Sequence, residues 1–265
     1  ESRNGEGINY YGISTILAAA IGPFIGILLL PFVGFKSVII LAIVLSVLVT
    51  VACYLFPVQN IELTDDHKKL LNSWSLNTFI EYKVLFISIV AFLIGLSYSS
   101  VLGFLSIYAD NLGLSTAGAF FFVVYALIIT FTRPFAGQIF DAKGENAVMY
   151  PSFIFLAIGL LTLSYTTTSF MLLLSGALIG LGYGTFMSNG QAVCLKLVES
   201  SKVSIALSTY FIGLDLGLGF GPYALGTVHS FLSYSGIYVL CAVLTVAVAI
   251  LYAIFYKGKD AKAIN

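Results

Sequence analysis

The chain has 265 residues, of which 59% are hydrophobic and only 9% are charged, whereas soluble domains carry about 25% charged residues. Twelve basic residues balance twelve acidic ones, so no positive excess supports binding to nucleic acid. The three cysteines are scattered through apolar runs without metal-ligand spacing, and no phosphate-binding glycine loop indicates an ATPase. The composition therefore predicts an integral membrane protein without a metal site or a cofactor.

Eight apolar stretches are long enough to cross a bilayer as helices, which takes about 20 residues each. They cover residues 8–33, 37–57, 83–109, 115–138, 147–167, 170–194, 203–228 and 232–256. Because these runs are continuous and do not alternate, the predicted fold class is an all-α bundle of eight transmembrane helices. Eleven of the twelve basic residues then fall on one side, with Lys36 as the exception, and this side is expected to be cytoplasmic.

The stretch 58–82 is the one long connection between predicted spans, and it lies on the cytoplasmic side. It separates two spans in residues 1–57 from six spans in residues 83–256, and a cytoplasmic tail follows at 257–265. Charged residues followed by spaced apolar ones around Trp74 favour a short helix on the membrane surface, with a plain linker as the alternative.

The first and seventh predicted spans share a Gly-Pro element, Gly22-Pro23 in one and Gly221-Pro222 in the other, 199 residues apart. A repeat of this length, with six spans after the linker, predicts two halves of six helices each. The first half would then begin before Glu1. We interpret the chain as spans five to twelve of a twelve-helix protein, without the first four.

Glycines four residues apart lie on one face of a helix and let a neighbouring helix approach closely, and proline bends the helix. Gly22, Pro23 and Gly26 have this arrangement in the first span, and Gly217, Gly221 and Pro222 have it in the seventh. These residues are candidates for an interface that changes during a conformational cycle. Ordinary small-residue packing is the alternative.

A polar segment, from Arg133 to Gly144, connects the fourth and fifth spans and contains Gly137, Asp141 and Lys143. Taken alone, it fits a solvated turn in which Asp141 caps a helix. The segment resembles the cytoplasmic loop motif of the major facilitator superfamily. The Gly22-Pro23 element resembles the antiporter motif in span five of its twelve-span drug:proton antiporters. The resemblance implies a charge latch, formed by Arg133, Asp141 and Lys143 and by helix contact at Gly137. Ala142 and Glu145-Asn146 depart from the basic residues of that motif.

Asp215 is the one acidic residue deep inside a predicted span. Since a carboxylate is costly in hydrocarbon, such a residue usually faces a protein interior or a water-filled cavity. Asp215 is therefore a candidate proton or substrate site, and a structural aspartate that binds nearby backbone is the alternative.

The resemblance also implies a substrate site near the middle of the membrane, between the halves. Polar and aromatic candidates for it are Tyr98, Ser99, Tyr125, Asn189, Gln191 and Tyr210, and tyrosine rings suit flat amphipathic or cationic molecules. The function expected is proton-coupled efflux of small amphipathic compounds by alternating access, in a monomer of the plasma membrane whose partners are lipid and substrate. Uptake or exchange of a metabolite is the alternative within transport, and a channel or scaffold is the alternative outside it. No cluster of residues indicates a membrane enzyme.

Overall fold

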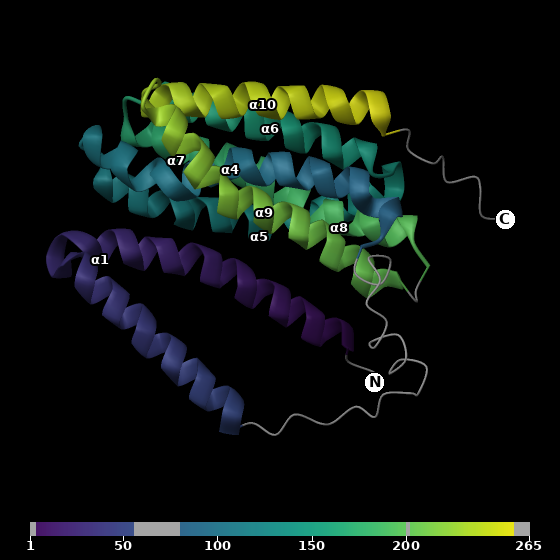
Figure 1. The fold of residues 1–265 in the computed structure, drawn as a ribbon, viewed down its shortest axis with the longest axis horizontal. Coiled ribbons are helices and arrows are strands. Elements are labelled where there is room, and N and C mark those ends of the chain that lie inside the picture. Colours follow the sequence, from purple (N-terminus) through teal and green to yellow (C-terminus); the bar gives the residue numbers. More distant parts are fainter. Residues whose placement is uncertain (1–3, 56–79, 200–201, 257–265) are drawn as a thin grey trace.

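The computed structural model describes residues 4–55, 80–199 and 202–256, and in the first helix it describes side chains for Ala18 and from Ile21 onward. All regular elements in these ranges are helical (Figure 1), so the predicted all-α class is confirmed. The predicted surface helix around Trp74 and the tail 257–265 lie outside the described residues.

The first two predicted spans form α1 (Asn4–Leu55), which folds back on itself at Gly34. Gly34 has φ 73° and ψ 162°, a conformation that glycine adopts without steric cost. Figure 1 shows the two arms of α1 beside the bundle, meeting at a sharp bend. The first arm contacts α5 (Ser115–Lys143), where the rings of Phe24 and Phe120 lie 5.4 Å apart.

The remaining helices form a bundle (Figure 1). A short 3-10 turn, η1 (Tyr82–Val84), leads into α4 (Leu85–Asn111), which is followed by α5 and α6 (Asn146–Ser164). The next span combines α7 (Ser169–Ile179), a π-helical segment η2 (Gly180–Gly184) and α8 (Thr185–Leu197). The bundle is completed by α9 (Val203–His229) and α10 (Tyr234–Phe255). Within the described ranges, seven helices are long and apolar enough to cross a membrane, with α1 counted once.

The helix α5 is longer than the predicted span 115–138, because it continues to Lys143. It ends at Gly144, whose φ of 81° breaks the helix while its N–H donates to the carbonyl of Phe140 over 2.9 Å. The prediction that the segment from Arg133 onward lies in a loop was therefore wrong. The apolar run shows where the hydrocarbon ends, but a helix can continue into the polar region beyond it.

The closest helix crossing that the structure describes joins α4 and α9. A Cβ added at Gly95 would lie 2.6 Å from the carbonyl oxygen of Leu214, and one at Gly217 would overlap the carbonyl of Phe92. Gly213 faces the carbonyl of Ser88 on the same helix, and Gly221 faces the side chain of Ser99. Glycine is required here because the two backbones touch. The small residues of the seventh predicted span thus form a packing seam with α4.

Polar contacts join the helix ends at both sides of the bundle. At the end where α4 stops, the hydroxyl of Tyr108 lies 3.1 Å from the carbonyl of Leu163, and the Ser164 hydroxyl donates to the carbonyl of Ser235 over 2.9 Å. At the opposite end, Lys202 pairs with Glu81 at 3.1 Å. These contacts hold α4, α6, α9 and α10 together where apolar packing ends.

Candidate functional site

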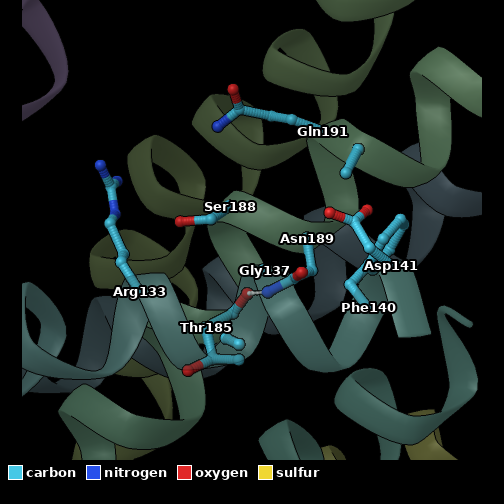
Figure 2. Close-up of a pocket in the computed structure, with 10 residues that line it drawn as sticks. Arg133, Gly137, Phe140, Asp141, Thr185, Ser188, Asn189 and Gln191 are labelled. Carbon is cyan, nitrogen blue, oxygen red and sulfur yellow. Dashed lines mark hydrogen bonds between the residues drawn. The ribbon is translucent and has the colours of Figure 1, made fainter. Parts of the chain in front are cut away.

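A polar cavity of about 330 Å³ lies between α5 and α8 (Figure 2). Pockets of this size hold small organic molecules. Its lining brings together residues that the sequence analysis assigned to two different roles, the latch and the substrate site: Arg133, Gly137, Asp141, Asn189 and Gln191. Ser188 and Thr185 also line it. They were not predicted, because single hydroxyl residues in an apolar helix carry no distinctive signal.

Arg133 is a cation inside a membrane-spanning helix, ten residues before α5 ends at Lys143. At 1.5 Å per residue, this distance is roughly 15 Å along the helix axis. Its Nε atom is buried and has no hydrogen-bond acceptor among the described residues. Figure 2 places Arg133 and Asp141 at opposite sides of the cavity, with Ser188 between them. In the described part of the chain, the ion pairs involve neither of these two residues.

The polar side chains of α8 donate hydrogen bonds to their own helix. Asn189 Nδ2 donates to the carbonyl of Thr185 over 2.8 Å, and Gln191 Nε2 donates to that of Met187 over 3.1 Å. The Ser188 hydroxyl donates to the carbonyl of Gly184 over 3.2 Å. These bonds leave the oxygen atoms of the three side chains as acceptors on this wall of the cavity.

A stack of three tyrosine rings lies deeper in the bundle. The Tyr98 ring is 3.8 Å from that of Tyr183 and nearly parallel to it, and the Tyr125 ring lies 5.7 Å from Tyr98 on a third element. All three side chains are buried. Tyr98 and Tyr125 were predicted, whereas Tyr183 was missed. It lies in the π-helical segment η2, whose glycine spacing indicated helix packing and not a substrate site.

Asp215 lies midway along α9, and its side chain is exposed in the described structure. Its neighbour Leu214 is buried against α4, as is Gly217. Asp215 therefore lies off the packed seam.

The other predicted residues have different surroundings. Ser99 and Tyr210 are buried, with their hydroxyls donating to the carbonyls of Leu96 (2.7 Å) and Met187 (3.3 Å). Lys143 is exposed at the end of α5. A Cβ added at Gly22 or Gly26 would meet no described atom within 4 Å. The close helix approach predicted at these two glycines is therefore not seen among the described residues.

Glu145 connects three helix ends beside the cavity, and the sequence analysis noted it only as a departure from a basic pattern. One carboxylate oxygen lies 3.3 Å from Lys196 Nζ, and the other accepts a hydrogen bond from the Tyr256 hydroxyl over 3.2 Å. Lys196 Nζ also lies 4.1 Å from the centroid of the Phe140 ring. The start of α6, the end of α8 and the residue after α10 thus meet at one carboxylate.

The fold and the site define a polytopic membrane protein with a polar cavity and an acid within its spans. The sequence profile of the Major Facilitator Superfamily matches residues 1–166 and 141–265, which together cover the chain. The chain belongs to this superfamily, whose members are transporters and not enzymes.

Relatives in three organisms fit this assignment. Multidrug resistance protein MdtG of Proteus mirabilis is 27% identical over 191 residues, which are 69% of this chain and 44% of that protein. MdtG of Citrobacter koseri is 31% identical over 141 residues, 51% of this chain and 34% of that protein. An MFS-type transporter of Methanocaldococcus jannaschii is 22% identical over 261 residues, 95% of this chain and 66% of that protein. The chain thus spans between about a third and two thirds of the length of these relatives.

Proposed function

We propose that the chain forms spans five to twelve of a twelve-span exporter that expels small amphipathic compounds in exchange for protons. In this proposal, residues 83–256 form the second six-helix half and the 58–82 linker is cytoplasmic. Similarity to two proteins named for multidrug resistance supports efflux. The observation that carries proton coupling is the exposed carboxylate of Asp215 within a membrane-spanning helix.

A carboxylate in this position can bind a proton or a cationic substrate, but not both at once, since the proton removes the charge that attracts the cation. Competition of this kind couples two fluxes when the site faces each side of the membrane in turn. Asp215 would serve as the coupling residue, and the tyrosine rings would provide a flat apolar wall for the substrate.

The test uses the full-length carrier in inside-out vesicles with an imposed pH gradient, to which cationic dyes are added. We expect each transported dye to collapse the gradient and Asp215→Asn to abolish this effect. Asp110→Asn is the matched control, because Asp110 is exposed at the end of α4 and accepts a hydrogen bond from the Ser115 hydroxyl over 2.8 Å. A response that survives Asp215→Asn would return Asp215 to a structural role.

Two alternatives give different results in the same vesicles. A carrier for metabolite uptake or exchange would leave the gradient intact with every dye and would respond to its own substrate. A channel would dissipate the gradient without any added compound. The family membership of the chain favours a carrier over a channel.

A further inference from the structure

Arg133 lines the cavity between α5 and α8 and is partly exposed, but its guanidinium contains one buried donor. The Nε–H of Arg133 has no partner among the described residues, and the atom itself is buried. A guanidinium stays charged at any physiological pH, so Arg133 cannot lose a proton to remove the unsatisfied N–H. Leaving a buried donor of a charged group unsatisfied is costly, which makes the position favourable for an acceptor from outside the described chain.

The opposite wall of the cavity, on α8, offers hydrogen-bond acceptors, whereas Arg133 on α5 offers donors. Ser188, Asn189 and Gln191 each donate one hydrogen bond to a carbonyl of their own helix. Their oxygen atoms remain as acceptors on this wall, and each amide also keeps a second N–H. A molecule that fits both walls has an anionic group toward Arg133 and N–H or O–H groups toward α8. Figure 2 shows the Ser188 hydroxyl pointing toward the side of the cavity where Arg133 lies.

Asp141 fixes the direction in which such a molecule binds. It lines the same cavity eight residues after Arg133 on α5, roughly 12 Å further along the helix axis. Because Asp141 is exposed, water can solvate its charge, whereas the buried part of Arg133 lacks that compensation. Repulsion from Asp141 therefore keeps an anionic group at the Arg133 end.

We infer that this cavity binds small organic anions, with the carboxylate or phosphate of the ligand accepting hydrogen bonds from Arg133. The forked guanidinium suits both groups, since their oxygens can accept two parallel bonds. The inference rests on the proposed transport function only in taking the anion as cargo. It extends the substrate range from cations at Asp215 to anionic or zwitterionic amphiphiles at a second position.

The test compares two dyes that share a xanthene ring system, fluorescein as the anion and rhodamine 123 as the cation. Binding is measured by fluorescence anisotropy to the full-length carrier in nanodiscs of neutral phosphatidylcholine. Removing the partner of a charged group with Arg133→Gln should weaken fluorescein binding about tenfold or more and leave rhodamine 123 binding unchanged. Arg133→Lys should give an intermediate loss, because lysine keeps the charge but not the fork.

Two controls separate binding from folding and from total charge. Lys83→Gln removes a positive charge that is exposed in η1, away from the cavity lining, and should leave fluorescein binding unchanged. Gln191→Leu keeps all charges but removes an acceptor from α8, and should weaken fluorescein binding. Equal loss of both dyes in Arg133→Gln, or no loss of either, would overturn the inference.

An anionic lipid headgroup offers the same chemistry as a soluble anion, so a second arm includes phosphatidylglycerol in the nanodiscs. If the ratio between the fluorescein affinities of the wild type and Arg133→Gln is the same with and without phosphatidylglycerol, the cavity binds a soluble anion. A ratio that falls to one would assign the cavity to the lipid and overturn the inference. Loss of proton coupling at Asp215 would affect only the proposed function, because the anisotropy measurement needs no gradient.

Discussion

Glu145 binds Lys196 through one carboxylate oxygen, at 3.3 Å, and the hydroxyl of Tyr256 through the other, at 3.2 Å. The Glu145 side chain is 13% exposed and that of Lys196 is 48% exposed, so solvent screens the pair on one side only. A residue at the start of α6 thereby holds the ends of two other spans in place.

Replacing Glu145 should loosen this end of the bundle. We expect Glu145→Ala to lower the apparent melting temperature of the purified carrier, since it removes both contacts, with a cost of about 1 kcal/mol. Glu145→Lys should cost more, because it places two cations together. The exchanged pair, Glu145→Lys with Lys196→Glu, should recover part of the loss. If the double variant is as unstable as Glu145→Lys alone, the ion pair does not stabilise the bundle.

The pair between Glu81 and Lys202 predicts a dependence of stability on pH. The hydrogen bond from Lys202 lowers the pKa of Glu81 below its ordinary value of 4.5, and the Lys83 backbone N–H adds to this effect. A carboxyl with a lowered pKa in the folded state adds stability above its unfolded pKa, and this stability is lost as the pH falls through the folded value. The added stability is at most about 1 kcal/mol, because Lys202 is half-exposed.

This dependence is measured by comparing melting temperatures of the wild type and Glu81→Gln between pH 7 and pH 3. The wild type should be more stable at pH 7, and the difference should shrink below about pH 4.5. Lys202→Gln should weaken the pH dependence of stability without abolishing it, since it removes the largest cause of the lowered pKa but leaves the Lys83 N–H. A difference that stays constant down to pH 3 would exclude a role for the charge of Glu81.

The seam between α4 and α9 offers a matched pair of glycines on a single helix. A Cβ at Gly217 would overlap the carbonyl of Phe92, whereas one at Gly219 would meet nothing within 4 Å. Gly217→Ala should therefore destabilise the carrier by about 1–3 kcal/mol, the usual cost of overpacking. Gly219→Ala should be neutral or slightly stabilising, because alanine favours the helix. Thermal unfolding of both variants tests the crossing, and equal stability of the two would contradict it.

The tyrosine stack predicts an effect on transport that differs from an effect on folding. Tyr183→Phe keeps the ring 3.8 Å from Tyr98 and should change transport little. Tyr183→Leu removes the ring and should raise the KM for flat aromatic dyes severalfold, as expected for loss of a stacking contact of about 1 kcal/mol. Tyr223→Leu is the control, because Tyr223 is 71% exposed. Equal KM values for Tyr183→Leu and the wild type would remove the stack from the substrate path.

The positions of the spans could be predicted from the sequence because bilayer thickness sets a minimum length for each apolar run. The helix α9 starts at Val203, as predicted. The helix α4 starts at Leu85, two residues after the predicted start at residue 83. The ends of helices were predicted less well. Lys143 and the residues before it continue α5, because Gly144 and not the edge of the hydrocarbon stops that helix.

The contacts between spans could not be predicted from single helices. The repeated Gly-Pro element indicated a small-residue interface, yet only the fold shows that Gly217 meets α4 and that Gly22 meets no described atom within 4 Å. Arg133 and Gln191 were assigned to different roles, and they line one cavity. Tyr183 was not predicted, because the glycines that flank it at 182 and 184 indicate close helix packing but do not show which ring is buried there.

The π-helical segment at Gly180–Gly184 has a consequence for the polar wall that follows it. A π turn contains one residue more than an α turn, so every later side chain is rotated by about 100° relative to an uninterrupted helix. A helical wheel drawn through residues 169–197 would therefore place Ser188 and Gln191 on the wrong side. Deleting Leu181 would remove the extra residue and let the segment close into a regular α-helix that still directs Ser188 and Gln191 toward the cavity. A residue inserted into the α-helical stretch between Gly184 and Ser188 would instead turn both side chains by about 100°. The chemistry of the cavity thus depends on the number of residues before it as well as on their identity.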